Sequence, residues 1–246
     1  MHADQPAINA YWTARSNYYH ARQIAGERAI AERQLWQEAW RAALPSSAHK
    51  VLDVGTGSGY IATLLADLGC DVTGIDLSEG MLEQARKHHE QRAQEGLSVA
   101  RFVRYDALAP SSVSGPFDAV VSRYLMWTLP EPVQAIQAWV KISRPGGVII
   151  CADAPWFPDG IAADTAVESD AGKDSFTSTY CPEVLRNLEL AQARSSQEYS
   201  EVFQRAGLQD IDVQQLPEIA ELDHRFGTLP GEECRPRFLI SGVVPS

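Results

Sequence analysis

A short apolar segment that runs into three alternating glycines constrains the fold of this chain most. The sequence KVLDV over residues 50–54 is followed by GTGSG over 55–59, and a helix-forming stretch begins at once. A second apolar segment then ends on Asp76, 21 residues after Gly55. Glycines let a backbone approach a ligand closely, a helix start presents N–H groups, and an acid about 20 residues on can accept hydrogen bonds from ribose hydroxyls. The pattern predicts a strand–turn–helix site for a nucleoside-containing small molecule.

The glycine spacing indicates which class of nucleoside ligand this is. A dinucleotide fingerprint reads G-x-G-x-x-G, but here Tyr60 holds the sixth position and the third glycine, Gly59, comes one position early. This disfavours a nicotinamide-dependent dehydrogenase, for which no hydride-transfer pair is evident either. The spacing resembles motif I of the class I S-adenosylmethionine-dependent methyltransferases. The resemblance implies that Asp53 and the glycine loop hold the methionine part of the cofactor, and that Asp76 holds the ribose.

Three later segments extend the resemblance in the same order. RFVRYDA over 101–107 ends near Asp106, an acid of the kind that this family uses for the adenine amino group. Residues 117–123 resemble the fourth strand, whose end faces the reacting methyl, and RPGGVII over 144–150 resembles the Pro-Gly-Gly turn into strand five. Together the signals cover roughly residues 48–152. The cofactor-binding residues implied are Asp53, Gly55, Thr56, Gly57, Gly59, Asp76, Leu77, Met81, Asp106, Ala107, Arg123, Tyr19 and Arg15.

Strand and helix signals alternate through this core. We expect strands near 50–55, 71–76, 99–104, 117–122 and 147–152, with helices near 59–68, 79–94 and 131–143. Such alternation predicts a mainly parallel sheet with helices on both faces. Further strands near 209–215 and 237–244 close it, and the resemblance implies that the last strand is antiparallel. The expected fold is α/β: a doubly wound, Rossmann-like, seven-stranded, mostly parallel sheet.

The length of 246 residues suits a single domain over 1–246. We divide it into an N-terminal helical cover (1–46), a cofactor-binding core (48–152), a lid or variable loop (153–181) and a C-terminal part of the sheet (182–246). Residues 7–44 are expected to be helical, with apolar positions such as Ile24, Ile30, Trp36 and Trp40 on one stripe. Helix signals return over 182–206. Whether residues 154–181 form an ordered lid stays open.

The charge balance excludes several classes of partner. The formal net charge is −11, so a nucleic-acid partner or an anionic membrane surface is not expected. With no targeting signal and no long apolar run, the expected location is cytoplasmic. The cysteines, at positions 70, 151, 181 and 234, form no C-x-x-C pair, so no metal is expected. A thiol set of the kind one methyltransferase subfamily uses for arsenic is left open.

The N-terminal segment resembles an opening found in many small-molecule members of this family. That opening reads W-x-x-R-x-x-x-Y-D, and here Trp12, Arg15 and Tyr19 match it while His20 replaces the aspartate. The resemblance implies that an aromatic and an arginine fold over the methionine end of the cofactor. Plain helix packing is the alternative for Tyr18 and Tyr19, and position 20 departs from the family pattern.

Candidate acceptor-binding residues follow strand four. Arg123 is suited to a substrate carboxylate or phosphate, or else to an ion pair with a nearby acid. Trp127 is either a stacking wall or a core residue. The candidate substrate-binding residues are Tyr11, Tyr18, Tyr124, Trp127 and Trp156, and the candidate catalytic residues are Arg123, Tyr19 and His20.

Among the histidines, His88 and His89 are expected to be solvated on the polar face of the helix over 79–94. His20 and His224 are better placed for a general base, although a chance loop position explains either.

The function predicted is S-adenosylmethionine-dependent methyl transfer to a small molecule, with S-adenosylhomocysteine as product. Methyl transfer from a sulfonium is accelerated chiefly by holding the nucleophile in line with the departing sulfur. Such proximity lowers the activation barrier by up to about 7–11 kcal/mol. The acceptor atom (O, N, S or C), the use of a general base, the pathway and the oligomeric state are not readable. The alternatives are different chemistry on the same cofactor, or a non-catalytic cofactor-binding module.

Overall fold

The computed structural model describes residues 3–110, 112–161, 168–169, 172–173, 175–227 and 234–246. The elements of the first half are α1 (Gln5–Ile24), α2 (Gly26–Ala43), β1 (Lys50–Val54), α3 (Tyr60–Asp67), β2 (Asp71–Asp76), α4 (Glu79–Gln94), β3 (Arg101–Arg104), β4 (Phe117–Arg123) and the 3₁₀ turn η1 (Met126–Thr128). Those of the second half are α5 (Pro132–Lys141), β5 (Ser143–Asp153), β6 (Glu168–Ser169), β7 (Gly172–Lys173), α6 (Phe176–Thr179), α7 (Pro182–Arg186), α8 (Ser196–Arg205), β8 (Gln209–Gln215), α9 (Pro217–Phe226) and β9 (Phe238–Val243).

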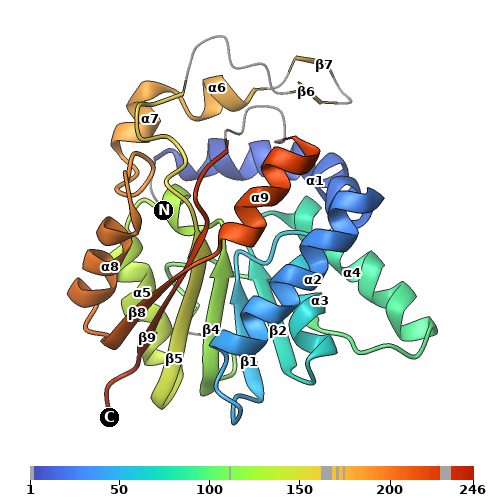
Figure 1. Ribbon diagram of the computed structural model, residues 1–246, viewed down its shortest axis with the longest axis vertical. Coiled ribbons are helices and arrows are strands. Elements are labelled where there is room, and N and C mark those ends of the chain that lie inside the picture. Colours follow the sequence, from blue (N-terminus) through green and yellow to red (C-terminus); the bar gives the residue numbers. More distant parts are fainter. Residues whose placement is uncertain (1–2, 111, 162–167, 170–171, 174, 228–233) are drawn as a thin grey trace.

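The main sheet has seven strands in the order β3-β2-β1-β4-β5-β9-β8 (Figure 1). β9 runs antiparallel to both of its neighbours, whereas the other pairings are parallel. The strand order reverses between β1 and β4, so their carboxyl ends flank the crevice in which such sheets bind ligands. The expected α/β fold with an antiparallel last strand is confirmed.

Helices cover both faces of this sheet, as expected. On one face α2 and α3 bury Trp36, Trp40 and Leu64 against β1 and β4, and Ile219 of α9 joins this cluster. On the other face Trp139 of α5 and Phe203 of α8 pack against β4, β5 and β9. The core is therefore two apolar layers separated by the sheet, and the edge at the strand ends is left for a site.

The helical N-terminal segment is two helices rather than one. Ala25 is extended, with φ −112° and ψ 143°, and Gly26 has φ +87°, a left-handed value that favours glycine, so the chain turns between α1 and α2. The predicted apolar stripe holds only in part: Trp36 and Trp40 are fully buried, but Ile24 and Ile30 are 54% and 72% exposed. The turn explains this, because residues before and after it no longer share one helical face.

α1 lies across the carboxyl-end edge of the sheet and is tied to the core at two places. The hydroxyls of Thr13 and Ser78 are 2.9 Å apart, and the Ser58 hydroxyl donates to Gln23 Oε1 at 2.8 Å. Gly80 permits the first contact, because a Cβ atom there would lie 2.8 Å from the backbone oxygen of Thr13. α1 therefore covers the glycine loop and the start of α4.

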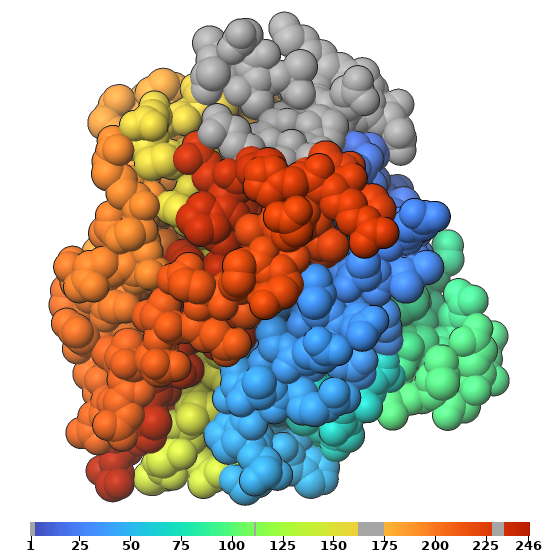
Figure 2. All heavy atoms as spheres, in the orientation of Figure 1, coloured from blue at the N-terminus to red at the C-terminus, as the bar shows by residue number. Residues whose placement is uncertain are grey.

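The C-terminal part differs from expectation in two places. The predicted helical stretch over 182–206 is two helices, α7 and α8, and α8 begins at a capping box made by Ser195 and Glu198. α9 was not predicted; it lies between β8 and β9 and packs beside α2 on the face seen in Figure 2. In the expected lid, β6 and β7 pair antiparallel, while residues 162–167, 170–171 and 174 lie outside the described residues. Within the described part, no helix is both long and apolar enough to cross a membrane.

Candidate functional site

The glycine loop joins β1 to α3 at the switch point of the sheet. Gly55, Gly57 and Gly59 have φ values of +67°, +54° and +82°. The Gly57 N–H donates to Oδ2 of Asp76 at 2.9 Å, and the Ser78 N–H donates to Oδ1 of the same carboxylate at 2.8 Å. Burial raises the pKa of Asp76, and these backbone donors oppose the shift. The loop and the strand-two acid thus form one connected unit.

Asp53 lies beneath this loop rather than in an open cavity. It is 1% exposed and accepts a hydrogen bond from the Thr56 hydroxyl at 2.6 Å. Burial raises the pKa of Asp53 to about 7, against the Thr56 bond and the nearby Arg123 charge, which lower it. Gly59 precedes α3, and a Cβ atom on it would meet the Phe102 ring at 2.9 Å. These residues shape and hold the loop from below.

A narrow cavity of about 120 Å³, here called the cofactor cavity, opens above the loop. Nine of the predicted cofactor residues line it: Gly55, Gly57, Asp76, Leu77, Met81, Asp106, Ala107, Arg123 and Tyr19. The other four, Asp53, Thr56, Gly59 and Arg15, are not among its lining residues. Asp106 accepts a hydrogen bond from the Leu108 N–H at 2.9 Å through Oδ1.

α1 closes the cofactor cavity from above, in part with residues that motif matching missed. Gln5, Ile8 and Asn9 are the missed residues, and they line the cavity together with Trp12 and Tyr19 of the N-terminal motif. Oδ1 of Asn9 is buried and has no hydrogen-bond partner among the described residues. An unsatisfied buried acceptor is costly unless a ligand supplies a donor. The signal that could have found these residues is their three- and four-residue spacing, which places them on one face of α1.

A second cavity of about 560 Å³, here called the acceptor chamber, lies beside the first. Its lining residues are Tyr11, Trp12, Arg15, Tyr18, Tyr19, Ala21, Arg22, Gln23, Ala25, Arg28, Glu32, Arg123, Tyr124, Trp127, Trp156, Phe157, Phe176, Ile219, Asp223 and Arg237. Trp12, Tyr19, Arg123 and Tyr124 belong to both cavities. The structure therefore brings all five predicted substrate residues to one chamber that adjoins the cofactor cavity.

Hydrogen bonds fix the aromatic walls of the acceptor chamber. The Trp12 indole donates to the Tyr180 hydroxyl at 2.8 Å, which lies 2.9 Å from the Thr128 hydroxyl. Trp127 is 5% exposed and its indole donates to the Tyr124 backbone oxygen at 3.0 Å, so it is both a core residue and a wall residue. These hydrogen bonds tie the aromatic wall residues to one another and to the backbone.

Asp153, at the end of β5, holds another wall residue in place. Its Oδ1 accepts the Trp156 indole N–H at 2.6 Å and the Ala154 N–H at 2.9 Å. The carboxyl is fully buried, and burial raises its pKa to about 7 against these donors. Asp153 is not a lining residue, so we regard it as a positioning residue for Trp156.

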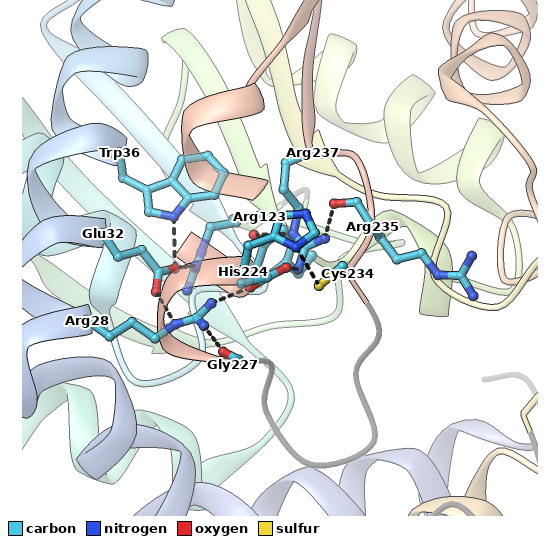
Figure 3. A network of polar contacts seen from close by, with 11 residues as sticks. Arg28, Glu32, Trp36, Arg123, His224, Gly227, Cys234, Arg235 and Arg237 are labelled. Atoms are coloured by element: carbon cyan, nitrogen blue, oxygen red, sulfur yellow. Dashed lines mark hydrogen bonds and ion pairs between the residues drawn. The ribbon is translucent and has the colours of Figure 1, made fainter. Parts of the chain in front are cut away.

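A chain of alternating charges runs from Arg237 to Arg123 among residues that line the acceptor chamber (Figure 3). Arg237 donates to Asp223 at 3.0 Å, Asp223 accepts from Arg28 at 2.6 Å, and Arg28 lies 3.6 Å from Glu32. Glu32 in turn lies 3.4 Å from Arg123. The ion pair weighed for Arg123 is thus present. The sequence did not reveal the other members, because α2, α9 and the residue before β9 supply them from distant parts of the chain.

Arg123 also lies against three aromatic rings. Its guanidinium carbon is 4.7 Å from the centroids of Tyr60 and Tyr124 and 5.4 Å from that of Trp36. Such cation–π contacts and the Glu32 pair hold the side chain at the boundary of the two cavities. Burial raises the pKa of the Tyr124 phenol to about 12, against the neighbouring arginines, so this hydroxyl stays protonated.

The two histidines predicted as candidate general bases, His20 and His224, line neither the cofactor cavity nor the acceptor chamber. His20 lines a third cavity, of about 230 Å³, together with His88, and is not a lining residue of the other two. Its Nδ1 is buried and has no partner among the described residues. His224 contacts Cys234 Sγ at 3.9 Å. The structure therefore does not bring the predicted catalytic His20 into either of the cavities that Arg123 and Tyr19 line.

The expectation that His89 is solvated was wrong. It is 4% exposed, its Nε2 lies 2.9 Å from the Thr63 hydroxyl, and its Nδ1 accepts the Ala100 N–H at 2.9 Å. Burial, with neighbouring positive charges, lowers its pKa to about 4. His89 joins α4 to α3 and β3. In the described part of the chain, no three histidine, cysteine or acidic residues are grouped to hold a metal, and the cysteines are free thiols.

Part of the chain matches a known protein family. Residues 52–151 match a family model described as a methyltransferase domain. The ubiquinone biosynthesis O-methyltransferase of Methylococcus capsulatus is 38% identical over 101 residues, which are 41% of this chain and 41% of that protein. The chain thus matches about two fifths of the length of such curated relatives.

Solved structures share the fold over more of the chain. Phosphoethanolamine N-methyltransferase 2 of Haemonchus contortus, solved with phosphomonomethylethanolamine and S-adenosylhomocysteine, superposes with a TM-score of 0.67 at 16% identity, covering 100% of this chain and 61% of that one. The (4+2)-cyclase SpnF superposes with a TM-score of 0.57 at 17% identity, covering 85% and 80%. At these identities the likeness concerns the fold. Residues 52–151 thus match a methyltransferase domain, and the strand order of the sheet is the one that the resemblance to the class I S-adenosylmethionine-dependent methyltransferases implies.

Proposed function

We propose that this protein transfers the methyl group of S-adenosylmethionine to a small molecule held in the acceptor chamber. The observation that carries the proposal is the meeting of two cavities at Trp12, Tyr19, Arg123 and Tyr124. One cavity has the glycine loop and two acids of a nucleoside site, and the other has aromatic and charged walls. A methyl group presented at their boundary would face the chamber.

The residues of the cofactor cavity fit S-adenosylmethionine. Asp76 would accept hydrogen bonds from the ribose hydroxyls and Asp106 from the adenine amino group, while Gly55 and Gly57 leave room for the backbone to approach. Asn9 would accept a donor from the ligand. At about 120 Å³ the cavity is narrower than pockets that enclose a ligand of this size. We therefore infer that α1 moves outward when the cofactor enters.

The cofactor, when bound, supplies a methyl group already activated by its sulfonium. The residues of the chain then hold the acceptor close to that group and exclude water. The carboxylates among the described chamber residues, Glu32 and Asp223, are paired with arginines, which disfavours a role for either as general base. We propose that Tyr19 and Arg123 orient the acceptor at the boundary and that His20, in its separate cavity, has no part there.

The remaining assignments follow the same proposal. We retain a single domain with a helical cover over 1–46, a cytoplasmic location and a small-molecule partner. The acceptor atom is not assigned, because oxygen, nitrogen, sulfur and carbon nucleophiles all suit transfer by proximity.

Arg123→Met should reduce turnover more than it reduces cofactor affinity. If it instead weakens cofactor binding and leaves turnover intact, Arg123 does not lie on the acceptor side of the boundary.

Calorimetric titration with S-adenosylmethionine, S-adenosylhomocysteine and NAD in parallel tests the cofactor. We expect binding of the two sulfur ligands and none of NAD; NAD binding alone would overturn the proposal. Mass spectrometry of reactions with a panel of acceptors then tests transfer, through the appearance of S-adenosylhomocysteine and a product heavier by one methylene.

A second candidate is different chemistry on the same cofactor site, since the cyclase named above shares the fold. Consumption of an acceptor without formation of S-adenosylhomocysteine would favour it.

A further inference from the structure

We propose that Tyr124 is a specificity-determining residue whose phenol O–H donates a hydrogen bond to a carbonyl oxygen of the methyl acceptor. This inference rests on the proposed function, because it names the chemistry of the substrate that the same site would bind. Three features of Tyr124 carry it: a left-handed backbone, a ring held by its neighbours, and a hydroxyl whose hydrogen has no acceptor among the described residues.

The backbone of Tyr124 has a conformation that is uncommon for a tyrosine. Its φ is +58°, and among the described non-glycine residues only Asp210 also has a positive φ. Such a residue costs free energy and persists where its surroundings hold it, often at a binding site. Here the Tyr124 N–H donates to the Ala152 oxygen at 2.8 Å, and the Tyr124 carbonyl accepts the Trp127 indole at 3.0 Å. This turn, directly after β4, places the tyrosine side chain at the boundary of the two cavities.

Three neighbours hold the ring of Tyr124. Its centroid lies 4.9 Å from that of Trp156 and 5.9 Å from that of Trp36, with interplanar angles of 89° and 77°, so both contacts are edge-to-face. The Arg123 guanidinium carbon lies 4.7 Å from the same centroid. Because the ring is held on several sides, its hydroxyl loses little conformational entropy when it binds a ligand.

The hydroxyl of Tyr124 uses only part of its hydrogen-bonding capacity. Its oxygen accepts the Arg237 Nε–H at 3.2 Å, but no described residue accepts its hydrogen. A phenol can donate one hydrogen bond while it accepts another. Burial raises the pKa of this phenol to about 12, so the hydrogen stays on the oxygen at neutral pH. The bond from a cationic group also polarises the O–H and strengthens it as a donor.

The contact with Arg237 shows on which side of the boundary the hydroxyl lies. Arg237 lines the acceptor chamber but not the cofactor cavity, whereas Tyr124 lines both. Since Arg237 Nε is 3.2 Å from the phenol oxygen, the hydroxyl end of the tyrosine lies on the chamber side. A ligand oxygen that accepts this O–H would therefore lie in the chamber, close to the atoms that face the cofactor.

The single donor suits a neutral oxygen better than an anion. All three guanidinium nitrogens of Arg237 are engaged: Nε with Tyr124, Nη1 with the Arg235 carbonyl at 2.6 Å, and Nη2 with Asp223 at 3.0 Å. A carboxylate or phosphate that leaves water needs several donors, whereas one or two satisfy a carbonyl oxygen. The aromatic walls of the chamber favour a planar carrier. We therefore expect a planar molecule with a carbonyl oxygen near its nucleophilic atom.

The competing explanation is that the hydroxyl serves the fold alone, as an acceptor for Arg237. Tyr124→Phe separates the two explanations, and Tyr60→Phe is the matched control. The Tyr60 ring centroid also lies 4.7 Å from the Arg123 guanidinium carbon, its hydroxyl is buried without a partner among the described residues, and it lines neither cavity. A purely structural role predicts a lower melting temperature for Tyr124→Phe and no change in the choice between ligands.

The test uses full-length protein saturated with S-adenosylhomocysteine and pairs of planar probes of equal shape. Acetophenone is compared with 2-phenylpropene, and 4-hydroxyacetophenone with 4-isopropenylphenol, by ligand-observed NMR titration. We expect the ketone of at least one pair to bind about fivefold more tightly than the hydrocarbon analogue. In Tyr124→Phe the two dissociation constants should agree within about twofold, while Tyr60→Phe should keep the wild-type preference.

The contrary results are distinct. If S-adenosylhomocysteine binds and the wild type prefers no ketone, the substrate chemistry is wrong and the proposed function stands. If the preference survives in Tyr124→Phe, or if 4-hydroxybenzoate binds more tightly than 4-hydroxyacetophenone, another group binds the ligand and the inference is overturned. If Tyr124→Phe weakens S-adenosylhomocysteine binding alone, the hydroxyl serves the cofactor and the inference again fails.

If S-adenosylhomocysteine does not bind the wild type, the proposed function fails and the inference falls with it. Thermal melts followed by circular dichroism show whether each variant is folded before its affinities are compared. The preference of the wild type tests the inference even where a variant is unstable.

Discussion

The backbone N–H of Gly57 donates a 2.9 Å hydrogen bond to the carboxylate of Asp76, which joins the first and second strand ends of the sheet. The bond orients the carboxylate along the edge of the cofactor cavity while the Ser78 N–H holds its other oxygen. The acid is therefore in place before any ligand arrives. Because this carboxylate is already oriented, it needs little reorganisation when it accepts hydrogen bonds from a ligand.

Replacing Asp76 with alanine should weaken S-adenosylhomocysteine binding by about 1–3 kcal/mol, through the loss of charged hydrogen bonds to ribose. Calorimetry at pH 7 measures the change. Asp71→Ala is the control, because Asp71 begins the same strand at the opposite end and pairs with the exposed Arg101. Equal affinities in the two variants would remove Asp76 from the cofactor site.

Asp223→Asn should destabilise the fold strongly. It leaves Arg28 and Arg237 without their shared carboxylate, and breaking a buried ion pair costs about 3–5 kcal/mol. Asp159→Asn should cost about 0–1 kcal/mol, since Asp159 and its partner Arg194 have side chains 78% and 70% exposed. Urea unfolding of both variants measures the difference. Similar midpoints would show that the buried chain of charges contributes little to stability.

His89 should make the free energy of unfolding fall as the pH falls. Its pKa is lowered to about 4 in the folded protein from an ordinary value of 6.5, so the unfolded chain binds more protons between these values. The stabilising contribution of neutral His89 is present above pH 6.5 and is lost progressively toward pH 4.

Asp53 and Asp153 have raised pKa values of about 7 and therefore shift stability with pH in the opposite direction. Comparing the wild type with His89→Gln at each pH isolates the contribution of His89 to the free energy of unfolding, because both proteins contain the two aspartates. The difference in free energy of unfolding should shrink by roughly 3 kcal/mol between pH 7 and pH 4. A difference that does not vary with pH would mean that His89 titrates normally in the fold.

Asn9→Ala should weaken S-adenosylhomocysteine binding about three- to tenfold while leaving the melting temperature of the free protein unchanged or slightly higher. The reason is that the buried Oδ1 has no partner among the described residues, so a donor from the ligand would offset its desolvation. Asn17→Ala, an exposed change on the same helix, is the control. If both variants bind equally well, Asn9 does not contact the cofactor.

The sequence predicted the core of the fold well, for a physical reason. Strand–turn–helix units such as residues 50–67 and 71–94 are specified locally by apolar runs, glycines and caps, so their bounds and order were readable. α9 was not readable in the same way. Its apolar residues, among them Ile219 and Leu222, meet neighbours that are distant in sequence, and the segment lies between two strand signals.

The candidate site was predictable only where a motif occupies consecutive positions. Asp76 and Asp106 follow strands, so the topology alone brings them to one cavity. Arg28, Asp223 and Arg237 come together from α2, α9 and the position just before β9, and no local sequence pattern indicates that they meet. His89 was misjudged because a polar neighbourhood in sequence does not show that α3 and β3 cover one side of α4.

Trp12, Tyr19, Arg123 and Tyr124 border both cavities, and this has a consequence for the interpretation of variants. Under the proposed function, we expect a change at any of these four positions to alter the dissociation constants of both the cofactor and the methyl acceptor. Its effect on one ligand then has to be separated from its effect on the other by a thermodynamic cycle. Substitutions that tune the choice of acceptor independently belong at positions such as Arg15, Phe157 and Phe176, which border the larger cavity only. Libraries aimed at new acceptors would begin there.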